Sequence, residues 1–351
     1  MDKKAMKVFL LMAVLLLMAG CQSSQEEADR QTSEPVENES SESLDGSTGD
    51  DVESEKNADD GDAESIDSSG EAETSNDDES STDVYSGAQK NPDYFIDTQV
   101  FDEGSRFYTA YAIHRDKEEK QALSPEERLE MSLLKNDPSE QDILRSYADL
   151  SFEWPHLYIH FHEDGNELST TSTQSTLFFD ALFGISDLYG VEEITFLNPD
   201  GEKGLTLAER SVDESIDVKD EKGLTRGYYT IYDEALEETL FLPGGELEEQ
   251  VVNENGEPLT FPETIDAMGT IDHADSFYSS AIVEGIQIVD SSLTNGVAAV
   301  QYTMDEDMVT EADQSVLENA IQLAALDFHA WEVQIINDTL KESSTYLLIG
   351  Q

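Results

Sequence analysis

Three histidines in one short segment have the types and spacing best suited to chemistry. Residues 156–162, His-Leu-Tyr-Ile-His-Phe-His, alternate polar and apolar side chains as a half-buried strand does. Alternate side chains of a strand share a face, so His156, His160 and His162 are expected to point the same way. Two imidazoles separated by one residue can bind one zinc, copper or nickel ion. The sequence therefore predicts a metal site at His160 and His162, with His156 as a further candidate ligand.

The same alternation also fits a strand that carries no site. Leu157, Ile159 and Phe161 then face the core, and the histidines lie on the solvated side of a sheet. Glu163 and Asp164 follow directly and could complete a ligand set, but no second cluster of His or Cys occurs in the sequence. Both interpretations stay open, and no cofactor is predicted.

Motifs for nucleophilic or nucleotide chemistry are missing from the sequence. It contains no Gly-x-Ser-x-Gly elbow and no Walker or dinucleotide glycine motif. Carboxylate pairs such as Glu332 and Asp338 cannot be singled out among 79 acidic residues. We therefore expect no catalytic residues and a protein that is not an enzyme. A cell-wall hydrolase with two placed carboxylates is the third-ranked alternative.

Cys21, the only cysteine, ends a short signal sequence. A lysine-rich start precedes an apolar run over 8–18, which is shorter than the roughly 20 residues that span a bilayer. Residues 1–20 are therefore predicted to be a signal peptide. The ending Met-Ala-Gly-Cys over 18–21 resembles a lipobox, which implies cleavage before Cys21 and attachment of diacylglycerol and an acyl chain such as palmitate. We expect a lipoprotein anchored on the outer face of the bacterial cell membrane.

The segment that follows Cys21 has the composition of a disordered chain. Residues 22–90 contain 23 acidic and three basic residues, and Tyr85 is their only aromatic residue. Such a segment cannot bury enough apolar surface to offset its chain entropy. We expect 21–90 to be an acidic, Ser-rich tether with a root-mean-square span of about 45 Å. It would hold the rest of the protein near peptidoglycan.

The acidic excess continues beyond the tether, because residues 91–351 contain 55 acidic and 13 basic residues. The whole chain has a net charge of −60. Without a basic patch to neutralise phosphates, nucleic acid is excluded as a partner. Adaptation to saline or alkaline surroundings explains the charge, and an acidic docking surface is the alternative.

One hydrophobic pattern occurs twice in the sequence at a constant offset. The first copy has apolar residues at helical spacing and then at strand spacing, namely Leu177, Phe178, Ala181, Leu182, Ile185, Tyr189, Ile194 and Phe196. The shift that takes Leu177 to Val316 finds an apolar residue at every matching position, namely Val316, Leu317, Ala320, Ile321, Ala324, Phe328, Val333 and Ile335. One neighbouring pair departs from the pattern, because Leu188 corresponds to the charged Asp327. The register indicates an internal duplication.

Strand and turn signals around the two copies predict an α+β fold made of two tandem small domains. Each domain is expected to be a mixed β-sheet with helices packed on one face. The predicted boundaries are 91–205 and 226–351, joined by a connector over 206–225. Within the first domain, 142–150 is expected to be helical.

These elements resemble the tandem GerMN domains of the GerM family of sporulation and germination lipoproteins. The resemblance rests on the helix and strand of each copy, 175–196 and 314–335, with the strands over 154–161 and 295–302 and the approach over 280–285. Val283 stands where the family typically has proline. The resemblance implies a non-enzymatic module that acts through protein–protein contacts, and it assigns no catalytic residue.

The leading interpretation is a membrane-anchored extracytoplasmic protein-interaction or assembly module in sporulation or spore germination. Its expected partners are the membrane, through the lipid on Cys21, and envelope or sporulation proteins. The alternative from another class is a ligand- or metal-sensing regulatory lipoprotein that uses His160 and His162.

Overall fold

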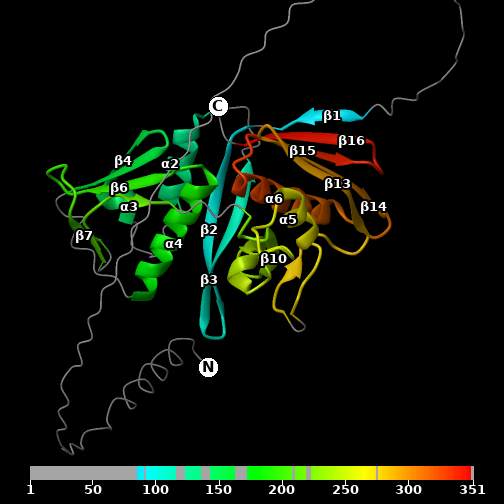
Figure 1. Ribbon diagram of the computed structural model, residues 1–351, viewed down its shortest axis with the longest axis horizontal. Coiled ribbons are helices and arrows are strands. Elements are labelled where there is room, and N and C mark those ends of the chain that lie inside the picture. Colours follow the sequence, from blue (N-terminus) through cyan, green and yellow to red (C-terminus); the bar gives the residue numbers. More distant parts are fainter. Residues whose placement is uncertain are drawn as a thin grey trace, which may run out of the picture. The chain divides into compact units, whose positions relative to one another are not determined.

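The computed structural model describes residues 85–90, 92–115, 123–135, 143–162, 172–207, 210–218, 223–273 and 276–348 (Figure 1). All of them belong to one compact unit, Asp77–Gln351. The predictions for the signal peptide, for Cys21 and for the tether up to residue 84 lie outside the described residues. So do Glu163 and Asp164. Within the described ranges, no helix is both long and apolar enough to cross a membrane.

The fold belongs to the α+β class, as predicted, and contains mixed sheets. The strands are β1 (Ser86–Gln89), β2 (Tyr94–Glu103), β3 (Arg106–Arg115), β4 (Ala148–Glu153), β5 (His156–Phe161), β6 (Glu193–Leu197), β7 (Leu205–Leu207), β8 (Arg210–Val212), β9 (Ile216–Asp217), β10 (Tyr228–Asp233), β11 (Glu238–Pro243), β12 (Ser279–Ser280), β13 (Ile286–Thr294), β14 (Val297–Met304), β15 (Glu332–Asn337) and β16 (Glu342–Leu347). The helices are α2 (Pro125–Lys135), α3 (Ile143–Tyr147), α4 (Ser172–Leu188), α5 (Phe261–Ala267) and α6 (Glu311–Asp327), with a 3-10 turn η1 (Gly244–Leu247).

These strands form three larger sheets and one hairpin. The strand orders are β1-β16-β15-β14-β13, β12-β10-β11-β3-β2, β4-β5-β6-β9 and β7-β8. The first and third sheets contain the two copies of the repeat, whereas the second takes strands from both halves of the chain.

The repeated hydrophobic pattern folds twice into the same β-hairpin, helix and strand. In the first copy, α4 connects the parallel strands β5 and β6; in the second, α6 connects the parallel strands β14 and β15. The shift that relates the two patterns takes the first and last residues of α4 to the first and last residues of α6. The last turns also match, because Gly190 (φ +75°) and His329 (φ +52°) are both left-handed residues just past the helix end.

The hairpins that precede the two helices correspond as well. Glu153 pairs with His156 across the first turn, and Thr294 pairs with Val297 across the second. Corresponding hairpin residues are two positions further apart in the sequence than corresponding helix residues. The connection from hairpin to helix is therefore two residues shorter in the second copy. Loops tolerate such changes, so the difference in spacing is consistent with one ancestral unit.

One face of each repeated sheet is buried beneath its helix. Leu157, Ile159 and Phe161 on β5 are buried, and the corresponding residues of β14 are Ala298, Val300 and Tyr302, also buried. Phe179 of α4 packs edge-on against Phe196 of β6, with ring centroids 6.2 Å apart. The apolar residues that alternate along each strand in the sequence therefore form the face of the sheet that packs against a helix.

The second sheet joins the ranges 91–205 and 226–351. Tyr111 of β3 pairs with Phe241 of β11. Arg128 of α2, only 3% exposed, donates from Nη1 to the carbonyl oxygen of Leu348 at 2.9 Å. Figure 1 shows the β2–β3 hairpin between α4 and α6. The two ranges share a sheet and core contacts, and the folding of either range alone stays a prediction.

Three details differ from the sequence-based elements. The helix expected over 142–150 is confined to α3, because Ala148–Glu153 pairs with β5 as strand β4. Ser86–Gln89, inside the range assigned to the tether, forms β1 and pairs in parallel with β16. The range assigned to the connector contains β8 and β9, and β9 extends the sheet beside β6.

Candidate functional site

The predicted histidine strand is β5, and its alternation is the one that the sequence indicates. His156 and His160 are half-buried on the face opposite Leu157, Ile159 and Phe161. This is the arrangement expected of a half-exposed sheet with or without a bound ion.

Acidic residues lie beside each of the three histidines. In register, His156 faces Glu153 on β4 and Glu193 on β6, and His160 faces Asp149 on β4. His162 Nε2 lies 3.1 Å from Asp149 Oδ2, with both side chains largely exposed. His160 Nε2 is buried without a hydrogen-bond partner among the described residues.

The described ranges contain no group of three or more His, Cys, Asp or Glu side chains arranged to hold a metal ion. The ligand pair His160 and His162, with His156 as a further candidate, therefore stays a prediction.

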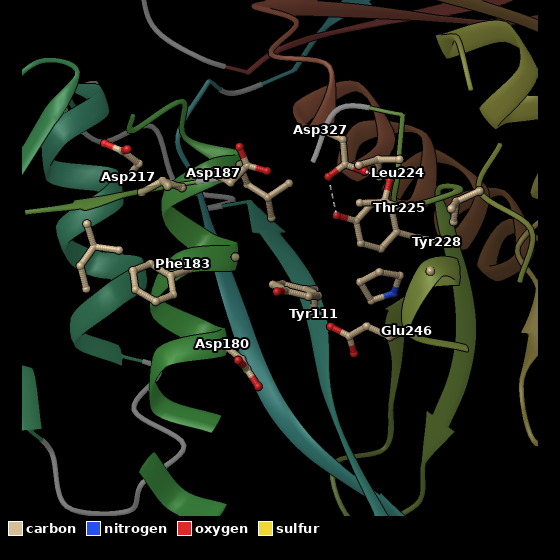
Figure 2. A pocket seen from close by; sticks show the side chains of 17 residues that line it. Tyr111, Asp180, Phe183, Asp187, Asp217, Leu224, Thr225, Tyr228, Glu246 and Asp327 are labelled. Atoms are coloured by element: carbon tan, nitrogen blue, oxygen red, sulfur yellow. Dashed lines mark hydrogen bonds between the residues drawn. The ribbon is translucent and has the colours of Figure 1, made fainter. Parts of the chain in front are cut away.

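A cleft of about 580 Å³ opens where the two halves of the chain meet. Its floor is Tyr111 on β3, one wall is α4, and the other is formed by β10, η1 and the end of α6 (Figure 2). Its apolar lining comprises Phe183, Leu188, Ile216, Val218, Leu224, Pro243 and Val251. The volume lies within the range of about 300–1,000 Å³ typical of small-molecule sites.

Five carboxyl groups line this cleft, namely Asp180, Asp187, Asp217, Glu246 and Asp327. The described lining contains no lysine or arginine. Burial raises the pKa of Asp180, and Arg210 opposes that shift. Asp187 Oδ1 lies 3.3 Å from His329 Nε2, which links α4 to a residue just past the end of α6. The cleft is therefore a region of negative potential with apolar walls.

Asp327, the last residue of α6, is 3% exposed. Tyr228 and Thr225 hydroxyls lie 2.9 Å and 2.5 Å from its two carboxyl oxygens. Burial raises the pKa of Asp327 to about 8, although the two hydroxyls and His329 act in the opposite direction. Asp327 is thus mainly a neutral carboxylic acid at pH 7.

Tyr111 extends from β3 across the cleft toward α4, as Figure 2 shows. Its side chain is 5% exposed, and its hydroxyl has no hydrogen-bond partner among the described residues. A Cβ atom added at Gly184 on α4 would collide with this hydroxyl. Burial, followed by the charges of Glu246, Asp327, Asp180 and Asp187, raises the pKa of Tyr111 well above its usual value. The phenol therefore stays protonated and available as a donor or acceptor.

A second hollow of about 460 Å³ continues the cleft along β3. It shares Asp180 and Glu246 with the first and is lined further by residues 106–109. Arg106 Nη1 contacts Glu248 Oε1 at 2.7 Å there, and both side chains are well exposed. The second hollow thus extends the cleft toward the turn of the β2–β3 hairpin, where Arg106 adds a positive charge.

Sequence reasoning did not assign any of the cleft residues to a site. One signal was present, since Asp327 is the charged residue at the apolar position that corresponds to Leu188. A charge on an otherwise apolar face of a repeated helix indicates a buried polar contact. Tyr111 carried no such signal, because its place depends on the pairing of β3 with β11, two strands that are far apart in the sequence.

No protein-family model matches the sequence, and no curated protein matches it. The comparison with solved structures finds a similar fold. It is that of the tandem GerMN domains of the sporulation protein GerM from Bacillus subtilis, with a TM-score of 0.39 and 10% identity. The match covers 70% of this chain and 96% of that chain. A likeness at this level does not assign a family or a function.

The geometry of the cleft suits binding of a cationic group. The carboxyl groups come from different elements, and among the described residues they do not converge on one point that a metal ion could occupy. The apolar walls could cover the body of a ligand while the acidic groups contact its charge.

Proposed function

We propose that this protein is a lipid-anchored extracytoplasmic lipoprotein whose two repeated units form a non-enzymatic protein-interaction or assembly module. The process that we propose for it is sporulation or spore germination. The sequence resemblance to tandem GerMN domains supports that process, and the lipobox at Cys21 supports the anchor.

The observation that carries this proposal is the position of equivalent strands in the two copies. β4 and β13 are the first strands of the two corresponding hairpins, and each is the outer described strand of its sheet. An outer strand has unpaired backbone groups that can accept a strand from a partner. A duplicated unit therefore offers two equivalent edges for assembly.

Strand β13 has an exposed and irregular edge. A bulge interrupts its pairing with β14 between Ile288 and Asp290, and Val289 is 53% exposed. Bulges limit unselective pairing of an edge. The regular stretch from Asp290 to Thr294 would thus be the part available to a specific partner.

Membrane anchoring is tested with a Cys21→Ser variant expressed from the native locus. We expect the unaltered protein in the membrane fraction and the variant in the culture medium or as uncleaved precursor. Labelling with a palmitate analogue should be lost in the variant. Equal distribution of both forms would contradict the anchor.

The assembly role is tested by deletion and by crosslinking in living cells. We expect deletion to reduce the yield of heat-resistant spores or to delay germination. A photo-crosslinking residue at Ser291 on β13 should capture an envelope protein, whereas one at Glu254, in the exposed turn between Val252 and Pro258, should not. Normal spores together with no capture at Ser291 would rule out the proposal. Release of peptidoglycan fragments by the purified protein would favour a cell-wall hydrolase.

A further inference from the structure

The acidic cleft contains the Tyr111 hydroxyl, which makes no hydrogen bond to the described residues. The Tyr111 side chain is buried at the joint of the two halves, lines the cavity, and has no hydrogen-bond partner for its hydroxyl among the described residues. The hydroxyl oxygen itself is not fully buried, so a ligand or a solvent molecule in the cleft can reach it and form the hydrogen bond that the described residues do not supply. This observation is independent of the acidic groups around it.

The surroundings of Tyr111 determine the charge of that partner. Asp180, Asp187 and Glu246 lie around the hydroxyl, and the described lining offers no lysine or arginine. An anion in this cleft would be repelled, whereas a cation would be attracted by the ionised carboxyl groups, which at pH 7 leave out most of the charge of Asp327. The phenol oxygen can accept a hydrogen bond from a cationic N–H group while its own proton remains available to a carboxylate.

The form of the cation follows from the walls of the cleft. The described residues provide no cluster of three carboxyl or imidazole ligands, which argues against a bare metal ion. Phe183, Leu188 and Leu224 provide apolar surface between the acidic groups. A ligand that satisfies both features has an ammonium group on an aliphatic chain.

We propose that this cleft binds an alkylammonium group, with the Tyr111 hydroxyl accepting an N–H hydrogen bond and Glu246 contacting the charge. The group is carried either by a lysine side chain of a partner peptide or by a free diamine. The site goes beyond the proposed assembly role. A negative binding result would leave the spore phenotype and the contacts of β13 unaffected, so the two proposals fail separately.

The experiment is calorimetric titration of the full chain from position 21 onward, produced with Cys21→Ser so that it carries no lipid. Two probes distinguish the sources: 1,5-diaminopentane, and acetyl-Gly-Lys-Gly-amide compared with the same peptide containing norleucine. Titrations in 0.5 M salt suppress diffuse attraction to the acidic surface, because the Debye length is then only about 4 Å. We expect saturable binding of one equivalent of at least one amine and none of the norleucine peptide.

Variants locate the binding. Tyr111→Phe and Glu246→Gln should each weaken binding by about tenfold, which corresponds to about 1.4 kcal/mol. Asp290→Asn, at an exposed position on β13, removes the same charge outside the cleft and should change the affinity less than twofold. Thermal melting of each variant verifies folding, which matters for Glu246→Gln because this exposed side chain already has an interaction partner.

Three outcomes would overturn the proposal. The first is no saturable binding of either amine. The second is an equal loss of affinity for Glu246→Gln and Asp290→Asn, because it would indicate diffuse attraction to the whole surface. The third is unchanged affinity in folded Tyr111→Phe together with unchanged affinity in Glu246→Gln.

Discussion

The Tyr228 hydroxyl donates a hydrogen bond of 2.9 Å to Oδ1 of Asp327, and both side chains are buried. The bond joins β10 to the last turn of α6 at one end of the acidic cleft (Figure 2). Because Asp327 is mainly neutral at pH 7, it holds these elements together with little added charge in the cleft.

The Asp327 carboxyl should make stability depend on pH. Burial raises its pKa from 3.8 to about 8 in the folded protein, whereas the unfolded chain keeps the ordinary value. Between these values the folded state binds more protons, so its stability is greatest below pH 4 for this group and falls as pH rises to 8. At about 1.4 kcal/mol per pKa unit, the loss has a ceiling of about 6 kcal/mol.

Asp327→Asn tests this effect, because asparagine resembles the neutral acid and does not titrate. We expect the variant and the unaltered protein to have similar Tm values at pH 5, and the variant to be more stable at pH 8.5. Differential scanning calorimetry across this range measures the difference. Asp290→Asn, at an exposed position, serves as the control with a difference that does not grow with pH. A constant difference for Asp327→Asn would contradict the raised pKa.

The closeness of Gly184 to Tyr111 gives a second prediction. A Cβ atom at position 184 would collide with the Tyr111 hydroxyl, so Gly184→Ala should reduce the free energy of unfolding. Overpacking costs about 1–3 kcal/mol, and the better helix propensity of alanine offsets about 1 kcal/mol of it.

Removing the hydroxyl should relieve this clash. In a Tyr111→Phe background, Gly184→Ala should be nearly neutral, which gives a coupling energy of about 1 kcal/mol in a double-mutant cycle. Urea unfolding of the four proteins measures it. Additive effects would mean that Tyr111 does not extend across the cleft to α4.

The repeated helices were predictable from the sequence, because their apolar residues recur at helical spacing and need only local information. The two hairpins were predicted in part: the strand expected over 295–302 overlaps β14, whereas Ala148–Glu153 lacked a signal strong enough to separate strand from helix. That segment is a strand because it pairs with β5, and tertiary pairing outweighs propensity.

The cleft depends on contacts that local patterns do not encode. Tyr111 reaches its place through the pairing of β3 with β11, and Asp187 meets His329 from the other copy of the repeat. Only Asp327 left a trace in the sequence, as a charge at an apolar position of the duplicated pattern. A comparison of the copies with each other is therefore more informative about this site than a search for motifs.

A zinc titration tests the predicted ligand pair at the end of β5, where His160 lies on the strand and His162 just after it. If His160 and His162 bind Zn²⁺, saturation at about 100 times the dissociation constant stabilises the folded state by about 2.7 kcal/mol and raises Tm. His160→Ala and His162→Ala should each abolish the increase. His156→Ala, which alters the residue opposite Glu193, shows whether this histidine contributes. An unchanged Tm of the unaltered protein would leave the three histidines as the solvated face of a sheet.

The large negative charge predicts that salt stabilises the folded state. With a net charge of −60, compaction brings carboxylates close together, and screening reduces their repulsion. The Debye length falls from about 30 Å at 0.01 M to about 3 Å at 1 M salt, so Tm should rise through this range.

A variant with four exposed acids neutralised should have a higher Tm at low salt and a smaller increase with salt. The four substitutions are Asp290→Asn, Glu254→Gln, Glu284→Gln and Glu306→Gln. Equal slopes for the two proteins would show that self-repulsion is not what limits stability. The acidity would then be better explained by a docking surface than by adaptation to a saline medium.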